Sequence, residues 1–239
     1  MRIRLILIFA LLFGCAAMRT GGKGGDGPLM VRARTTAAGG PMIEAELYWS
    51  GNKRVTEQKK QRMIFDIDSK TVTVVDKQHK QYSIRSFDEI LKQREVLNKR
   101  FDAMSQQQRE RVGLGKPITL KPTGKTEKIV GYTAKEYVLD GGPFAGSMWI
   151  AEDLQPATWR QWQQVVANAE SSGYAGRQLA EAIASQGGFL VRSELTLNLG
   201  AKPISLSTEV IEVSAKAAPP DLLVVPEGFH KVEAPIQTR

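Results

Sequence analysis

From residue 29 onward, apolar and polar side chains alternate in short runs, which predicts β-strands with one buried face. Along residues 43–49, an isoleucine, an alanine, a leucine and a tryptophan share one parity, while two glutamates and a tyrosine occupy the other. Comparable runs follow at residues 62–67, 71–75 and 82–84, with turn residues between them. Short strands at this spacing predict an antiparallel meander.

At residue 86 the apolar period changes from that of a strand to that of a helix. Ser86 and Glu89 form a capping box, because a serine hydroxyl and a glutamate carboxylate at this spacing can each satisfy a free amide of the first helical turn. Apolar residues then recur at helical spacing, at Phe87, Ile90, Leu91, Leu97, Phe101 and Met104. The pattern predicts one helix of about seven turns that continues to Val112 and stops at the glycines and proline of residues 113–117.

The second half of the chain contains both patterns. Strands are predicted at residues 118–120, 127–131, 134–139, 147–151, 188–199 and 204–215. Pro156 is predicted to begin a second helix, with Trp159, Trp162 and Val166 on one side. A shorter helical segment is expected near residues 177–185, and an irregular tail that contains several prolines follows the last strand.

These elements predict an α+β fold in which helices cover the concave face of a curved antiparallel sheet. A curled sheet would expose its concave apolar face to water, so amphipathic helices laid across that face complete the core. A loose fit would leave an apolar cavity that admits an acyl chain. The candidate cavity-lining residues are Leu97, Phe101, Met104, Trp159 and Trp162. Filling of the core is the alternative role for the two tryptophans.

The N-terminal segment has the pattern of a secretory signal. Two arginines precede an apolar run at residues 5–13, which is too short for a membrane span of about 20 residues. The single cysteine, Cys15, ends a segment at residues 12–15 that resembles the lipobox of bacterial lipoproteins. That resemblance implies cleavage before Cys15 and its acylation, and the following Ala16 favours the outer membrane. Cleavage after Ala17 without lipidation is the alternative.

These features divide the chain into three parts. We expect a signal peptide at residues 1–14, a lipidated cysteine with a glycine-rich tether at residues 15–28, and a single domain at residues 29–239. Apolar residues make up 42% of the chain and charged residues 24%, which is typical of a water-soluble globular body. The expected location is the periplasm, with a lipid anchor at Cys15 that holds the protein to the outer membrane.

Basic residues exceed acidic ones, and the excess is concentrated at residues 51–85. The formal net charge is +8, and this stretch holds nine Lys or Arg against four Asp or Glu. Solvated strand faces and hairpin tips carry such residues. Alternatively, a surface that includes Lys59, Lys60 and Arg62 meets a protein partner or anionic headgroups. Nucleic acid is not expected as a partner of an exported protein.

The search for catalytic and metal-binding motifs finds none. The two histidines, His79 and His230, lie in polar stretches, and with one cysteine the chain cannot assemble a Cys/His metal cluster. Asp66 and Asp68 lie two apart on a strand that leads into a turn, a spacing compatible with acid–base chemistry or Ca²⁺ binding. An aspartate at a strand end more often shapes the turn. We therefore predict no enzyme activity, no metal and no cofactor.

Three further segments resemble a group of bacterial exported domains of unknown function. They are residues 129–137, 148–154 and 225–229, and residues 50–53 are an earlier match. That group is similar to the outer-membrane lipoprotein carriers LolA and LolB, which implies a half-barrel with helices on its concave side.

The resemblance implies that the cavity of such a half-barrel holds acyl chains or contacts a partner protein. The expected function is therefore a non-enzymatic envelope protein that binds an acyl chain, a lipoprotein or another apolar ligand. A periplasmic interaction or sensor module without a cavity is the alternative.

Overall fold

The computed structural model describes residues 27–111, 114–154, 173–198 and 203–233. The predicted signal segment, Cys15, the predicted helix near residues 159–166 and the C-terminal residues 234–239 lie outside the described residues. The division of the chain at residues 14 and 28 therefore stays a prediction.

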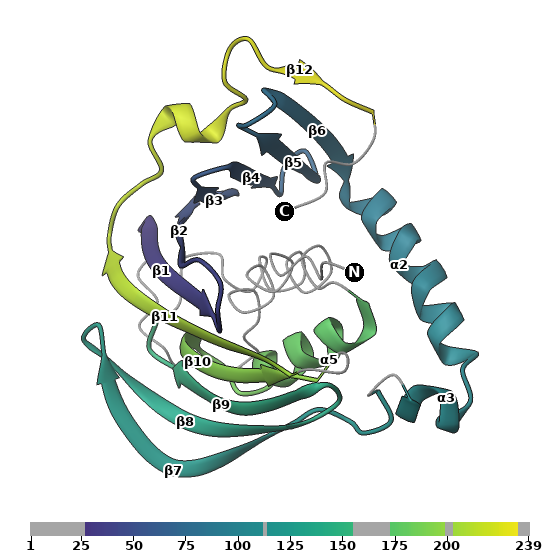
Figure 1. Cartoon of the computed structure of the whole chain (residues 1–239). Helices are drawn as coiled ribbons and strands as arrows, with labels where there is room; N and C mark the ends of the chain where they lie inside the picture. The colour runs from purple at the N-terminus through teal and green to yellow at the C-terminus, as the bar shows by residue number, and fades with distance from the viewer. Residues whose placement is uncertain (1–26, 112–113, 155–172, 199–202, 234–239) are drawn as a thin grey trace.

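The described residues form a sheet of 12 strands in the order β12-β6-β5-β4-β3-β2-β1-β11-β10-β9-β8-β7. The strands are β1 (Leu29–Ala37), β2 (Ile43–Ser50), β3 (Lys53–Gln58), β4 (Gln61–Asp66), β5 (Thr71–Asp76), β6 (Gln81–Ser86), β7 (Thr119–Ile129), β8 (Tyr132–Gly141), β9 (Phe144–Ala151), β10 (Phe189–Leu197), β11 (Ile204–Ser214) and β12 (His230–Lys231). Neighbours are antiparallel, except that β12 pairs with β6 in parallel. The sheet curves into an open trough (Figure 1). A large curved antiparallel sheet, as predicted, is the basis of the fold.

The core lies on the concave face of this trough, and β2 illustrates how the alternation produces it. Ala45, Leu47 and Trp49 are almost completely buried and belong to the main apolar cluster. Tyr48 points to the opposite face and is nevertheless buried, in a second cluster with Val55. Both faces of β2 are therefore covered, whereas the alternating pattern predicts one buried face.

A C-terminal segment, residues 215–233, covers the convex face, and we call it the C-terminal strap. It leaves β11, passes outside β2 and β3, and ends at β12 beside β6 (Figure 1). Ala218 and Leu222 complete the second apolar cluster, and the Ala218 N–H donates to Ser50 Oγ at 2.8 Å. A short 3-10 helix, η2 (Pro220–Leu223), lies within the strap. The predicted irregular tail is thus a structural part of the domain.

Arg62 holds the strap to the sheet. Its Nη1 donates to the carbonyl oxygens of Asp221 at 2.7 Å and Val224 at 3.1 Å, and its Nε donates to Glu57 Oε2 at 2.8 Å. The side chain is only 7% exposed. Arg62 therefore does not belong to the alternative partner-binding surface predicted with Lys59 and Lys60, because its guanidinium is bonded inside the molecule.

The predicted single helix over residues 87–112 is also wrong, because two helices occupy this stretch. Helix α2 (Phe87–Asp102) begins at the predicted capping box, in which both hydrogen bonds are present. It ends at Asp102, and α3 (Gln106–Arg111) follows. Ser105 and Gln108 form a second reciprocal pair: Gln108 N–H donates to Ser105 Oγ at 3.2 Å and Ser105 N–H donates to Gln108 Oε1 at 2.7 Å. This pair starts a new helix and breaks the longer one.

Helix α5 (Gly173–Ala184) lies inside the curve of the sheet, and α2 runs along the open side (Figure 1). Leu179, Ala180 and Ile183 of α5 are buried in the same apolar cluster as the concave face. From α2, Ile90 joins this cluster. The predicted cover at residues 159–166 lies outside the described residues, so complete cover of the concave face by helices stays a prediction.

The strand β7 differs most from its predicted extent. The pattern predicts two strands, at residues 118–120 and 127–131, but β7 runs continuously from Thr119 to Ile129, with an irregularity between Pro122 and Thr126. Most of its side chains are exposed, so no apolar alternation marks it. β7 is an edge strand of the sheet, and it contains a proline and several lysines. Such residues on an edge strand hinder its pairing with the edge of another sheet.

Candidate functional site

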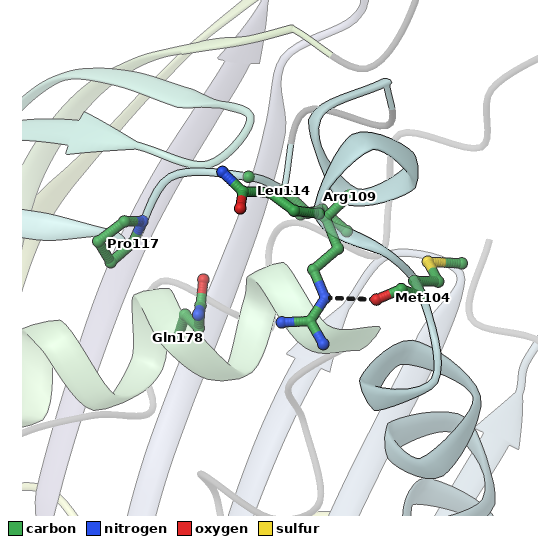
Figure 2. Close-up of a pocket in the computed structure, with 7 residues that line it drawn as sticks. Met104, Arg109, Leu114, Pro117 and Gln178 are labelled. Atoms are coloured by element: carbon green, nitrogen blue, oxygen red, sulfur yellow. Dashed lines mark hydrogen bonds between the residues drawn. The ribbon is translucent and has the colours of Figure 1, made fainter.

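A cavity of about 420 Å³ lies where the helices meet the start of β7 (Figure 2). It is bounded by the turn between α2 and α3, by α3, by the segment that leads into β7, and by α5. The lining residues are Met104, Gln106, Arg109, Leu114, Gly115, Pro117 and Gln178. Its volume falls within the range of small-molecule sites, about 300–1,000 Å³.

Arg109 is fixed at one side of this cavity. Its Nε donates to the carbonyl oxygen of Met104 at 3.2 Å, and its Nη2 donates to the carbonyl oxygen of Asp102 at 2.9 Å. Its guanidinium carbon lies 5.2 Å from the ring centroid of Phe101. The arginine thereby satisfies the last carbonyl of α2, which helix geometry leaves without an intrahelical partner, and a carbonyl of the turn that follows. Of the seven lining residues it alone is charged, and Glu110 lies next to the cavity, where its carboxylate accepts from the Gln106 amide at 3.1 Å.

Gln178 enters the cavity from α5, so two separate elements present polar groups to one space (Figure 2). Its Oε1 is buried and has no hydrogen-bond partner among the described residues. The next residue, Leu179, is buried in the main apolar cluster. A polar amide therefore lies at the border between the cavity and the core.

The structure describes only some of the residues predicted to line a cavity. Met104 lines the cavity, and Phe101 is buried beside it under Arg109. Trp159 and Trp162 lie outside the described residues, as does the side chain of Leu97. Their assignment to a ligand cavity stays a prediction. Sequence reasoning missed Arg109 and Gln178, because no periodic pattern marks either residue.

The concave face also buries a cation. Arg54 on β3 is 1% exposed, with its guanidinium carbon 4.8 Å from the Phe65 ring centroid and 5.8 Å from that of Trp49. Trp49 in turn makes an edge-to-face contact with Phe189 at 5.6 Å between centroids. Together with Arg62 on the convex side, Arg54 shows that the basic stretch at residues 51–85 is not entirely a surface feature.

The acidic pair shapes a turn. Asp66 Oδ1 accepts the backbone N–H groups of Asp68 at 3.0 Å and Ser69 at 3.1 Å, while Asp68 Oδ1 accepts from Asn52 at 2.8 Å. Partial burial of Asp66 acts to raise its pKa, but the Ser69 N–H and the neighbouring Lys53 outweigh it and lower the pKa below the usual value. A carboxyl group that stays ionised in this way supports the turn and is poorly suited to proton transfer at neutral pH.

The other groups considered for chemistry are dispersed. His79 is exposed and its Nδ1 lies 2.7 Å from Asp76 Oδ2, while His230 is exposed in β12. Within residues 27–233, where described, no three His, Cys, Asp or Glu side chains come close enough to hold a metal ion. No described helix combines the length and apolar character needed to cross a membrane.

Solved structures with similar folds are distant. The chain is 14% identical to PNGF-II with a TM-score of 0.42, and the match covers 87% of this chain and 31% of PNGF-II, so the chain spans about a third of that protein. An uncharacterised conserved protein from Thermus thermophilus is 10% identical with a TM-score of 0.45, over 87% of this chain and 90% of that one. A LolA superfamily protein, NE2245 from Nitrosomonas europaea, is 11% identical with a TM-score of 0.28, over 83% and 89%. At these TM-scores the likeness carries no functional inference.

Curated proteins yield no match. Residues 43–229 match a family described as a domain of unknown function, DUF4412. The match covers most of the chain and contains all three segments that predicted membership of an uncharacterised family, at residues 129–137, 148–154 and 225–229. The protein is therefore a member of the DUF4412 family.

Proposed function

We propose that this protein is a non-enzymatic envelope protein whose half-barrel binds an acyl chain or another apolar ligand. The observation that carries the proposal is the cavity at the junction of α2, α3 and α5, whose lining residue Gln178 directly precedes Leu179 of the main apolar cluster. Met104, Leu114 and Pro117 contribute apolar surface to a lining that also contains Gln106, Arg109 and Gln178, and Phe101 contacts the guanidinium of Arg109. In this proposal the acyl chain enters at the cavity and extends toward the apolar cluster of the concave face.

The energetics of such binding are favourable for a chain of ordinary length. Each buried CH₂ group contributes about 0.8 kcal/mol, so roughly ten buried methylenes contribute about 8 kcal/mol. That gain has to exceed the cost of immobilising the ligand, which is at least about 4 kcal/mol. The remaining gain of about 4 kcal/mol corresponds to millimolar affinity, so micromolar affinity requires burial of roughly 15 methylenes, along the concave face as well as in the 420 Å³ cavity.

Export and lipidation form the second part of the proposal. A basic start, a short apolar run and Cys15 support an envelope location with an acyl anchor, and the alternative cleavage after Ala17 would release a soluble periplasmic protein. We expect Cys15→Ser to move the protein from the membrane fraction to the soluble fraction and to remove the mass of the acyl groups. Membrane attachment without acyl mass in both forms would contradict the anchor assignment.

The binding prediction is tested with the Cys15→Ser chain, because this variant removes the covalent lipid that would otherwise confuse the measurement. The purified protein is extracted with organic solvent for lipid mass spectrometry, and is then titrated with a fluorescent fatty acid. We expect co-purified acyl lipid and saturable binding in the micromolar range. An empty extract together with no fluorescence change would refute the proposal and favour the alternative, a protein-interaction module without a ligand cavity.

A further inference from the structure

We propose that Arg109 and Gln178 bind the anionic end of an amphiphilic ligand, a carboxylate or a phosphate, at the mouth of the half-barrel. This inference rests on the proposed function and adds a chemical class to it: the acyl ligand carries a negatively charged head. The two residues lie on different helices and line the same cavity (Figure 2).

Arg109 supplies an available positive charge. Its side-chain hydrogen bonds go to two backbone carbonyls, of Asp102 and Met104, which hold the guanidinium in place without neutralising it. In the described part of the chain no carboxylate forms an ion pair with Arg109. A guanidinium fixed through Nε and Nη2 still has N–H groups on Nη1, and it recognises planar or tetrahedral oxyanions well. An anion in the cavity would provide the missing counter-charge.

Gln178 supplies the second observation. Its Oε1 is buried without a hydrogen-bond partner among the described residues. Leaving a buried polar atom unpaired costs about 1–3 kcal/mol, and native proteins seldom do so. The oxygen can accept a hydrogen bond from the P–OH of a singly protonated phosphate, and rotation of the amide presents its NH₂ group to an anionic oxygen instead. The unpaired amide thus indicates a partner that arrives with a ligand.

The surroundings orient the ligand. Met104, Leu114 and Pro117 line the cavity around Arg109, and Leu179, which follows Gln178, is buried in the core. The charged head therefore lies at Arg109, and the apolar chain extends from it toward the concave face. A free anion would contact Arg109 but has no apolar chain to contact the apolar residues. The need for both contacts distinguishes an amphiphile site from a simple anion site.

The test uses displacement of a fluorescent fatty acid from the full Cys15→Ser chain. The competitors are dodecanoate, dodecyl phosphate, dodecanol and inorganic phosphate, and the variant is Arg109→Gln. We expect the variant to weaken dodecanoate and dodecyl phosphate roughly 10- to 100-fold, as for the loss of hydrogen bonds to a charged group, and to leave dodecanol unchanged. The matched control is Arg100→Gln, an exposed position on α2, which should leave all four competitors unchanged. Thermal unfolding verifies that both variants fold.

The outcomes separate this inference from the function on which it rests. Equal binding of dodecanoate and dodecanol, unaffected by Arg109→Gln, would overturn the headgroup site while the apolar-ligand function stands. Displacement by inorganic phosphate as effective as that by dodecyl phosphate would overturn the amphiphile and leave an anion site. Failure of every acyl ligand to bind the parent chain would overturn both proposals.

Discussion

Replacement of Arg62 by leucine is expected to lower the free energy of unfolding by about 3 kcal/mol, the lower end of the range for breaking a buried ion pair. The side chain is 7% exposed and donates to Glu57 and to two carbonyl oxygens of the C-terminal strap. Leucine leaves both carbonyls without this donor. We expect the lower end of that energy range because Lys77 also forms an ion pair with Glu57, so this carboxylate keeps a counter-charge when Arg62 is replaced.

Denaturant unfolding measures this loss, and limited proteolysis shows where it acts. Early cleavage is expected in the C-terminal strap, at residues 215–233, before the sheet is cut. The matched control is Arg34→Leu, which removes an ion pair with Glu44 of 2.9 Å whose side chains are 46% and 45% exposed. It should cost less than about 1 kcal/mol. Equal losses in the two variants, or an intact strap in Arg62→Leu, would contradict the role of Arg62.

Gly146→Ala is expected to destabilise the protein by about 4 kcal/mol, through backbone strain and steric overlap together. Gly146 has φ +143°, and a Cβ built on it would lie 1.9 Å from the carbonyl oxygen of Glu194. The residue is in β9, opposite Leu195 of β10, so the clash can be relieved only if the two strands separate. A loss of this size would remove most of the stability of a domain at the lower end of the usual range, about 5 kcal/mol.

Soluble yield and chemical unfolding report the effect of Gly146→Ala. Gly124→Ala is the matched control, because Gly124 also has positive φ, +83°, but has no heavy atom within 4 Å of its built Cβ. It should show the backbone cost alone, about 1–2 kcal/mol. If the two alanine variants are equally stable, the close approach of β9 and β10 does not constrain the sheet.

The strand pattern could be predicted from the sequence wherever one face of a strand is apolar. β2 and β10 follow this rule, since their alternating side chains face the core. β7 does not, because its exposed edge carries polar residues on both faces. Burial of Tyr48 was not foreseeable from alternation, since it depends on a strap contributed by residues far along the chain.

The break between the helices could be predicted from the sequence, whereas the candidate site could not. The break after α2 had a local signal, the spacing of Ser105 and Gln108, which matches a capping box. The cavity had no local signal, because Arg109 and Gln178 line one space only through the packing of α5 against α2 and β7. Arg62 is likewise bonded to carbonyls 159 and 162 positions away, a separation at which local patterns carry no information.

The central claim is that an acyl chain lies on the concave side of the trough, with its head near Arg109. A fatty acid with a photoreactive diazirine at its terminal carbon tests this most directly, by irradiation with the Cys15→Ser chain and mass spectrometry of the labelled peptides. The predicted labels fall in α2, α5 and the inward-facing strand residues, and excess unlabelled dodecanoate should suppress them. Labels confined to the C-terminal strap and the convex face, or labels that unlabelled acid does not suppress, would contradict the claim.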